Sequence, residues 1–149
     1  MDYQPYVQKA IGWAKQQLES SDYCFLCLAF VEDAYEKSNG IEIFGGSTAT
    51  ESAELYAVLR GAGVPPPGAF VFYDWTGTIH GVTKNWGHVG LSCGDGKIIH
   101  AWGKVREDDY LAVEQLEAPP GSTPPRYIGW VGVERILQGH RGGNLPHDS

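Results

Sequence analysis

The sequence predicts an α+β fold in which N-terminal helices pack on one face of a central antiparallel sheet. Up to about Arg60, apolar residues recur at helical spacing. Pro65, Pro66 and Pro67 then interrupt the chain, because consecutive prolines fit neither a helix interior nor a central strand. The pattern after them changes to short β-type runs separated by turn residues. Helices first and strands second is the order of an α+β domain.

Length and composition indicate a single domain. The 149 residues can bury one sizeable core and are too few for two ordinary domains. With 42% hydrophobic and 19% charged residues, the chain is globular rather than disordered. We expect one domain over residues 1–149, with its core at about 5–137 and a loose tail at 138–149.

The first part of the chain is helical. The apolar spacing predicts three helices, at Tyr6–Leu18, Phe25–Lys37 and Glu51–Arg60. Pro5 stands at the entry of the first, where its missing N–H costs nothing. Asn39 and Gly40 end the second, because both tolerate a left-handed backbone. The intervening segment Ile41–Thr50, rich in Gly, Ser and Thr, is predicted as a loop.

The second part of the chain is β-rich. The pattern predicts four strands, at Ala69–Tyr73, His88–Cys93, Lys97–Trp102 and Tyr127–Ile136. Asp74–Trp86 and Ala118–Pro125 are predicted as loops from their turn residues. Asp108–Glu117 is ambiguous between a short helix and a strand, and Gly139–Ser149 is expected to be a loose tail.

Charge and hydropathy narrow the functional classes. A net charge of −7 argues against nucleic acid as the main partner. No apolar run approaches the ~20 residues of a membrane span. The N-terminus has no basic segment followed by an apolar block, so no signal peptide is predicted. Three cysteines cannot all pair within the chain, and at least one thiol is expected to be free.

Gly87–Gly103 is interpreted as a β-hairpin that carries two histidines, His88 and His100. Side chains alternate across a strand, so the turn decides whether the two imidazoles share a face. A two-residue turn at Asp95-Gly96 would put them on opposite faces. A three-residue turn at Gly94–Gly96 would put them on the same face.

The three-residue turn is the one that we predict, because Gly96 suits the left-handed position that such a loop needs. It pairs Cys93 with Lys97 and Gly90 with His100. The two histidines are then diagonal neighbours, about 7–8 Å apart at the backbone, and long side chains bridge that separation. Half-buried histidines in a sheet can also be free of chemistry, so the pair gains meaning only beside a nucleophile.

Cys27 is the nucleophile candidate, since it falls in the first turn of the second predicted helix. A helix N-terminus presents unpaired N–H groups and partial positive charge, which favour a thiolate. A neutral imidazole nearby can take the proton of the thiol and return it to a leaving amine. Cys24 lies at or before the helix start and is the weaker candidate. Cys93, on the strand face opposite His88, is expected to be a packed, inert thiol.

Three other interpretations of the cysteines stay open. Free cysteines are among the most buried residues, so core packing alone can explain any of them. Cys24 and Cys27 could bind zinc with the two histidines, although these lack the close spacing of a zinc ligand pair. A Cys-x-x-Cys before a helix also occurs in thiol-redox proteins, but there it follows a strand, whereas a helix and a polar loop precede it here.

Further candidates surround the hairpin. Three tryptophans could wall a cleft for a sugar or peptide or could be core residues of a small sheet: Trp75, Trp86 and Trp102. Asp22, Asp74 and His80 are polar residues expected near the cleft, and the last two are predicted as loop residues rather than catalysts.

Three blocks of the chain together resemble one family. Cys27–Val31, CLAFV, is similar to a Cys-Ser-Gly-Phe/Leu-Val helix, and Pro67–Phe72, PGAFVF, to a Pro-Gly-Asp-Leu-Val-Phe strand. His88–Leu91 followed by Ile98–Ala101 is similar to a His-Val-Gly-Ile … Ile-His-Ala hairpin, and Tyr127–Ile136 to a closing strand. These are the blocks of the NlpC-type (NlpC/P-sixty) cell-wall cysteine endopeptidases, which have a papain-like architecture. The likeness spans roughly residues 20–136.

The resemblance implies a papain-like NlpC-type fold and a Cys-His-His triad. Cys27 would be the nucleophile, His88 the general base and His100 the group that orients His88, with Tyr23 as the candidate near the oxyanion site. The family hydrolyses peptide bonds in peptidoglycan stem peptides and needs no metal or organic cofactor. The implied partners are therefore peptidoglycan peptides and, for an enzyme of this kind, an inhibitor or immunity protein. The implied place of action is the bacterial cell wall, in the periplasm or outside the cell.

The block around the nucleophile departs from the family pattern. The family commonly has Asp before the cysteine and Ser-Gly after it, where this chain has Leu26, Leu28 and Ala29. These neighbours help to shape the substrate site, so the departure leaves two alternatives open. One is an acyltransferase or deamidase with the same triad, and the other is a binding domain that has lost activity.

Overall fold

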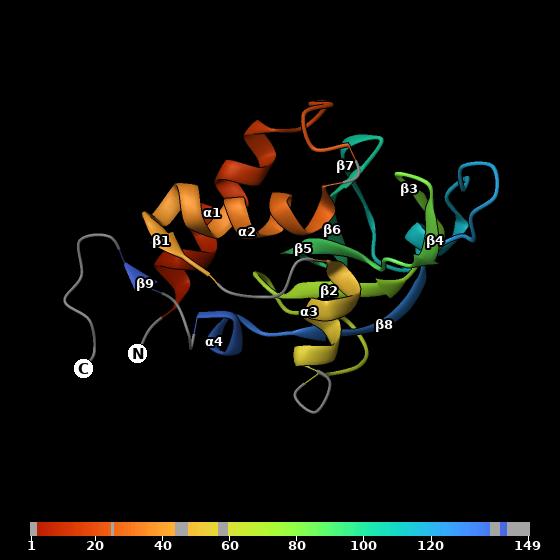
Figure 1. The fold of residues 1–149 in the computed structure, drawn as a ribbon. Coiled ribbons are helices and arrows are strands. Elements are labelled where there is room, and N and C mark those ends of the chain that lie inside the picture. The colour runs from red at the N-terminus through yellow and green to blue at the C-terminus, as the bar shows by residue number, and fades with distance from the viewer. Residues whose placement is uncertain (1–2, 25, 44–47, 57–59, 138–140, 143–149) are drawn as a thin grey trace.

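The structure is a computed structural model and describes residues 3–24, 26–43, 48–56, 60–137 and 141–142. Helices lie over one face of a five-stranded antiparallel sheet, as the sequence predicts for an α+β fold (Figure 1). A small two-stranded hairpin stands beside the end of this sheet. Among the described residues, no helix has both the length and the apolar character to cross a bilayer.

The three predicted helices exist, displaced by a few residues at their ends: α1 is Gln4–Gln16, α2 is Cys27–Asn39 and α3 is Ala49–Leu55. The end of α2 follows the sequence, since Gly40 adopts a left-handed backbone with φ 65°. Thr48 caps α3, because its side chain accepts a hydrogen bond from the backbone N–H of Glu51. The loop predicted at Ile41–Thr50 therefore holds the start of α3, and residues 57–59 of the predicted third helix lie outside the described residues.

The central sheet has the order β7-β6-β5-β2-β8. Its strands are β2 (Phe70–Asp74), β5 (His88–Gly94), β6 (Lys97–Trp102), β7 (Lys104–Asp109) and β8 (Arg126–Val131). All neighbouring pairs run antiparallel. The hairpin of β5 and β6 thus lies inside the sheet, with β2 on one side of it and β7 on the other.

The sheet has a hydrophobic core on each face. On the helix side, Val89, Leu91 and Ile99 pack with residues of α1, α2 and α3. On the other side lies a smaller cluster: Val71, Tyr73, Ile98, Tyr110 and Val113. The alternation along β5 and β6 places His88 and His100 on the face of this smaller cluster.

The prediction of a loop at Asp74–Trp86 is wrong. It contains a hairpin of β3 (Thr76–Ile79) and β4 (Val82–Asn85), joined by His80 and Gly81, which both have positive φ. Every residue of β4 is exposed, so no apolar alternation marks it in the sequence.

Three further segments differ from the prediction. Asp108–Glu117 divides into the end of β7 and a 3-10 helix at Ala112–Gln115. The last predicted strand ends at Val131, and Gly132 starts the short helix α4 (Val133–Ile136). The tail holds the strand β9 (Arg141–Gly142), paired with β1 (Ile41–Glu42), and its residues 138–140 and 143–149 lie outside the described residues.

Candidate functional site

The histidine hairpin has the predicted register, reached by a different route. Gly90 pairs with His100, as expected, but the turn is the two-residue Asp95-Gly96 turn with positive φ at both positions. A β-bulge between Ser92 and Gly94 adds one residue to β5, so Gly94 faces Lys97 in place of the expected Cys93. The bulge offsets the reversal of faces that a two-residue turn would cause, and both histidines remain on the same face.

The two imidazoles are in direct contact. His88 Nε2 and His100 Nδ1 lie 2.7 Å apart, and both side chains are buried. Gly90 makes room for this contact, since a Cβ there would lie 3.1 Å from His100 Cβ and 2.6 Å from Ile98 Cδ1. The ring of Trp102 meets that of His88 edge-on, with centroids 5.1 Å apart.

The hydrogen-bonded chain continues beyond His100 to a carboxylate that the sequence analysis missed. His100 Nε2 lies 2.8 Å from Asp108 Oδ2. Arg106 donates to both oxygens of Asp108, from Nε at 2.7 Å and from Nη2 at 3.2 Å. The register of β6 with β7, which sets Arg106 opposite His100, brings these groups together.

Burial decides the charge of the two histidines. It holds the pKa of His88 well below its ordinary value, and the neighbouring His100 lowers it further. Burial also lowers the pKa of His100, although the carboxylate of Asp108 opposes that shift. Hydrogen bonds from His100 and Arg106 outweigh the burial of Asp108 and lower its pKa. At neutral pH both imidazoles are therefore neutral and Asp108 is ionised.

Cys27 is the first residue of α2 and is partly exposed. Burial of the thiol raises its pKa to about 11, although the backbone N–H groups of Val89, Leu28 and Cys27 itself oppose the shift. The N–H groups at the helix start act in the expected direction, since they lower the pKa, but burial is the larger effect and the thiol rests protonated at neutral pH. A thiol in this state needs a base at the moment of reaction.

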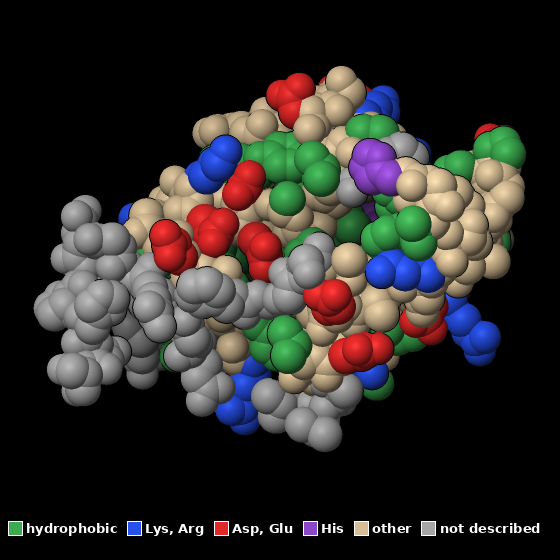
Figure 2. Space-filling view, viewed as in Figure 1, with side chains coloured by type: hydrophobic (Ala, Val, Ile, Leu, Met, Phe, Trp, Pro, Cys, Tyr) green, Lys and Arg blue, Asp and Glu red, His purple; other side chains and the backbone are tan. Residues whose placement is uncertain are grey.

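A pocket of about 620 Å³ is lined by several of the residues that the sequence analysis names as site candidates. Cys27 and His88 both line it, together with all three tryptophans predicted as candidate cleft walls, Trp75, Trp86 and Trp102. Figure 2 shows the surface hollowed beside a histidine side chain, with hydrophobic side chains around the hollow. The pocket opens where β5 begins and β6 ends, which is where α2 starts.

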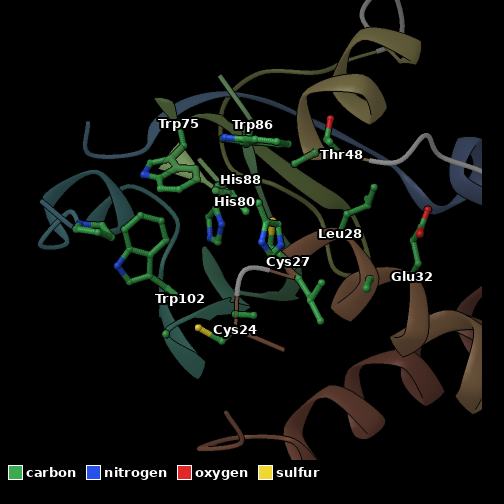
Figure 3. A pocket seen from close by; sticks show the side chains of 18 residues that line it. Cys24, Cys27, Leu28, Glu32, Thr48, Trp75, His80, Trp86, His88 and Trp102 are labelled. Carbon is green, nitrogen blue, oxygen red and sulfur yellow. The ribbon is translucent and has the colours of Figure 1, made fainter. Parts of the chain in front are cut away.

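The two sides of the pocket differ in chemistry. In Figure 3, Trp75 and Trp102 stand on one side of Cys27, and Leu28, Glu32 and Thr48 stand on the other. Glu32 is a second residue that the sequence analysis missed. Burial and the charges of Glu36 and Asp33 raise its pKa to about 7.

The structure does not bring Tyr23 into this pocket. Its hydroxyl donates to Asp33 Oδ2 at 2.7 Å, and its ring packs edge-on against Trp13 and Phe30. The aromatic contacts and the hydrogen bond tie Tyr23 to the helices, and it is not among the residues that line the pocket. The residues described as lining the pocket therefore do not include the candidate oxyanion residue.

The remaining candidates are sorted by position. Cys24 and His80 line the pocket and are exposed, whereas Cys93 lies at the bulge and hydrogen-bonds to Lys97 O and Glu107 Oε2. Asp74 accepts a hydrogen bond from Asn85 Nδ2, a contact that joins the end of β2 to the end of β4. Within the described part of the chain, no group of three or more His, Cys, Asp or Glu side chains is arranged to hold a metal ion.

Comparisons with solved structures give similar folds. NlpC1 from Trichomonas vaginalis is 21% identical with a TM-score of 0.52, over 84% of this chain and 44% of that one. NlpC2 from the same organism is 19% identical with a TM-score of 0.51, over 85% and 46% of the two chains. This chain thus spans less than half the length of either protein. A search of curated proteins finds no match.

A sequence comparison supplies the family. The profile of the NlpC/P60 family matches residues 12–116, which include Cys27, both buried histidines and Asp108. Members of that family are generally cell-wall peptidases and amidases, typically cysteine peptidases. By the extent of this match, the chain belongs to the NlpC/P60 family.

Proposed function

We propose that this protein is a cysteine peptidase that hydrolyses peptide bonds in bacterial peptidoglycan stem peptides. The observation that carries the proposal is the convergence of Cys27 and His88 on one pocket, with His100 hydrogen-bonded behind His88. Family membership supports a cell-wall peptide as the substrate. The site residues are Cys27 as the nucleophile, His88 as the general base and His100 as the residue that orients His88.

In the proposed mechanism, Cys27 Sγ attacks the carbonyl carbon of the scissile peptide bond. His88 takes the proton of the thiol and passes it to the leaving amine, which departs as a thioester forms on Cys27. Water, activated by the same imidazole, then cleaves the thioester and restores the thiol. The backbone N–H groups at the start of α2 lie beside the sulfur and are suited to stabilise the oxyanion.

The direct test is digestion of purified sacculi by the wild-type chain, Cys27→Ala and Cys93→Ser, with the released fragments identified by mass spectrometry. We expect wild type and Cys93→Ser to release stem-peptide fragments and Cys27→Ala to release none. Cys93 is a matched control, because it is a free thiol outside the pocket. Equal release by Cys27→Ala would contradict the proposal.

One observation favours a second candidate, an acyltransferase or deamidase with the same nucleophile. Leu26, Leu28 and Ala29, which replace the polar residues common in the family, all line the pocket. An apolar wall beside the thiol suits a less polar substrate than a stem peptide. Product masses separate the candidates, since hydrolysis adds water across a cut bond, transfer appears as a modified acceptor, and deamidation replaces an amide by a carboxylate without chain cleavage.

A further inference from the structure

Asp108 ends the hydrogen-bonded chain that begins at His88. Its side chain is mostly buried, it accepts from both a histidine and an arginine, and its lowered pKa keeps it ionised at neutral pH. An ionised carboxylate has no proton to give and can only accept hydrogen bonds. The contact of 2.8 Å with His100 therefore requires that His100 carries its proton on Nε2.

The proton position on His100 in turn determines the proton position on His88, the histidine that lines the pocket. His100 is neutral, so a proton on Nε2 leaves a lone pair on Nδ1. That lone pair faces His88 Nε2 at 2.7 Å, so His88 must carry its own proton on Nε2. Nδ1 of His88 is then the unprotonated nitrogen. His88 lines the same pocket as Cys27, where a basic nitrogen is needed.

We infer that Asp108, held by Arg106, is a positioning residue that fixes the tautomers of both histidines and so makes His88 Nδ1 the base for the thiol of Cys27. This inference rests on the proposed function, because it assigns a role within that mechanism. Asp108 acts through His100 and His88, and it does not line the pocket.

A purely structural role for Asp108 makes different predictions. If the carboxylate only braces β7 through its ion pair with Arg106, its loss would lower stability and leave the histidine protons where they are. If it fixes the tautomers, its loss leaves His100 Nε2 buried without an acceptor, and the imidazole can relieve that cost by moving its proton to Nδ1. The proton positions therefore separate the two roles.

The test is ¹⁵N NMR of the full chain with labelled histidine, in wild type, Asp108→Asn, Asp108→Leu and Asp109→Asn. Signals are identified by their loss in His88→Gln and His100→Gln. We expect both wild-type rings to be neutral with the proton on Nε2. Asp108→Asn should retain this state, since an amide oxygen still accepts from Nε2, whereas Asp108→Leu should populate the other tautomer. Asp109→Asn is the matched control, because the Asp109 side chain accepts a hydrogen bond from the backbone N–H of Leu111 and, among the described residues, is bonded to neither histidine.

A second readout follows the thiol itself. With Cys24 and Cys93 replaced by serine, the rate at which iodoacetamide alkylates Cys27 at pH 7 should fall in the order wild type, Asp108→Asn, Asp108→Leu. The rate should fall about tenfold from Asp108→Asn to Asp108→Leu, which is the effect of one pKa unit in the base. A proton on Nδ1 of His100 in wild type would overturn the inference. A folded Asp108→Leu with unchanged tautomers and alkylation would also overturn it.

The Asn variant keeps the inference testable if Asp108→Leu does not fold. It preserves the acceptor and removes the charge, so its alkylation rate must lie below that of wild type, and an unchanged rate would overturn the inference. Neither readout uses peptidoglycan. If sacculi are not digested while the tautomers follow Asp108, the proposed substrate fails and the role of Asp108 stands.

Discussion

Gly90 lies directly opposite His100 in the β5–β6 hairpin, and a Cβ on Gly90 would press on His100 Cβ at 3.1 Å and on Ile98 Cδ1 at 2.6 Å. The pair links register to chemistry. The His100 ring, set by this register, lies against His88 and next to Asp108. A substitution at Gly90 therefore affects the histidines without altering a reacting group.

We predict that Gly90→Ala lowers activity by at least tenfold and stability by about 1–2 kcal/mol, the usual cost of overpacking a well-packed site. The new methyl would meet Ile98 Cδ1 and His100 Cβ. Ile98→Val removes Cδ1, so Gly90→Ala/Ile98→Val should relieve the first contact and keep the second. Thermal melts and alkylation of Cys27 report the two effects; full recovery of alkylation in the double variant would show that His100 is not displaced.

Gly87, next to His88, offers a test of the backbone at the pocket. It has φ +74°, and a Cβ there would lie 2.6 Å from Thr50 N and Oγ1, whereas Gly81 has φ +77° and open space around it. Gly81→Ala should cost about 1–2 kcal/mol, from the left-handed backbone alone. Gly87→Ala should lower the free energy of unfolding by a further ~1–3 kcal/mol because of the added clash. Equal losses of Tm in the two variants would contradict the close contact with Thr50.

Glu32 predicts a pH dependence of stability. Its folded pKa of about 7 lies above the ordinary 4.5, so the folded state binds a proton more tightly than the unfolded state. Stability from this group is therefore lost as pH rises from about 4.5 through about 7. Glu32→Gln, which carries no charge at any pH, should stabilise the protein by about 1 kcal/mol at pH 8, after allowance for solvent screening.

The same substitution should have little effect on stability at pH 4, where Glu32 is protonated in the folded state and mostly protonated in the unfolded state. Denaturant unfolding at pH 4 and pH 8 measures the difference. Glu54→Gln, an exposed position on α3, is the control. A stabilisation of equal size at both pH values would show that it does not arise from the charge of Glu32.

The sequence predicts the fold class, the three helices and the central hairpin because their apolar residues follow clear periods. It does not predict β3 and β4, since β4 is exposed throughout and the one buried residue of β3 is Gly77, so neither strand shows an apolar alternation. It also misses the bulge at Cys93, because two-residue and three-residue turns share the same Gly-Asp-Gly residues and differ only in backbone geometry.

The candidate site follows the same division. Cys27, His88 and His100 are recognisable by residue type and spacing, and the structure places the first two at one pocket and the last two in contact. The sequence does not identify Asp108 as a site residue, because the pattern of its segment fits a helix or a strand equally well. Its contact with His100 depends on β7 continuing the sheet. The burial that raises the pKa of Cys27 is likewise a tertiary effect that no local motif reports.

The central claim is that His88 is the base for Cys27. The most direct measurement is the rate of iodoacetamide alkylation of Cys27 at pH 7 in wild type and His88→Ala, followed by peptide mass mapping with Cys93 as the internal reference. We predict that His88→Ala slows alkylation of Cys27 by about 100-fold or more, the usual contribution of a general base, while Cys93 reacts as before. Equal rates at Cys27 in the two proteins would contradict the claim.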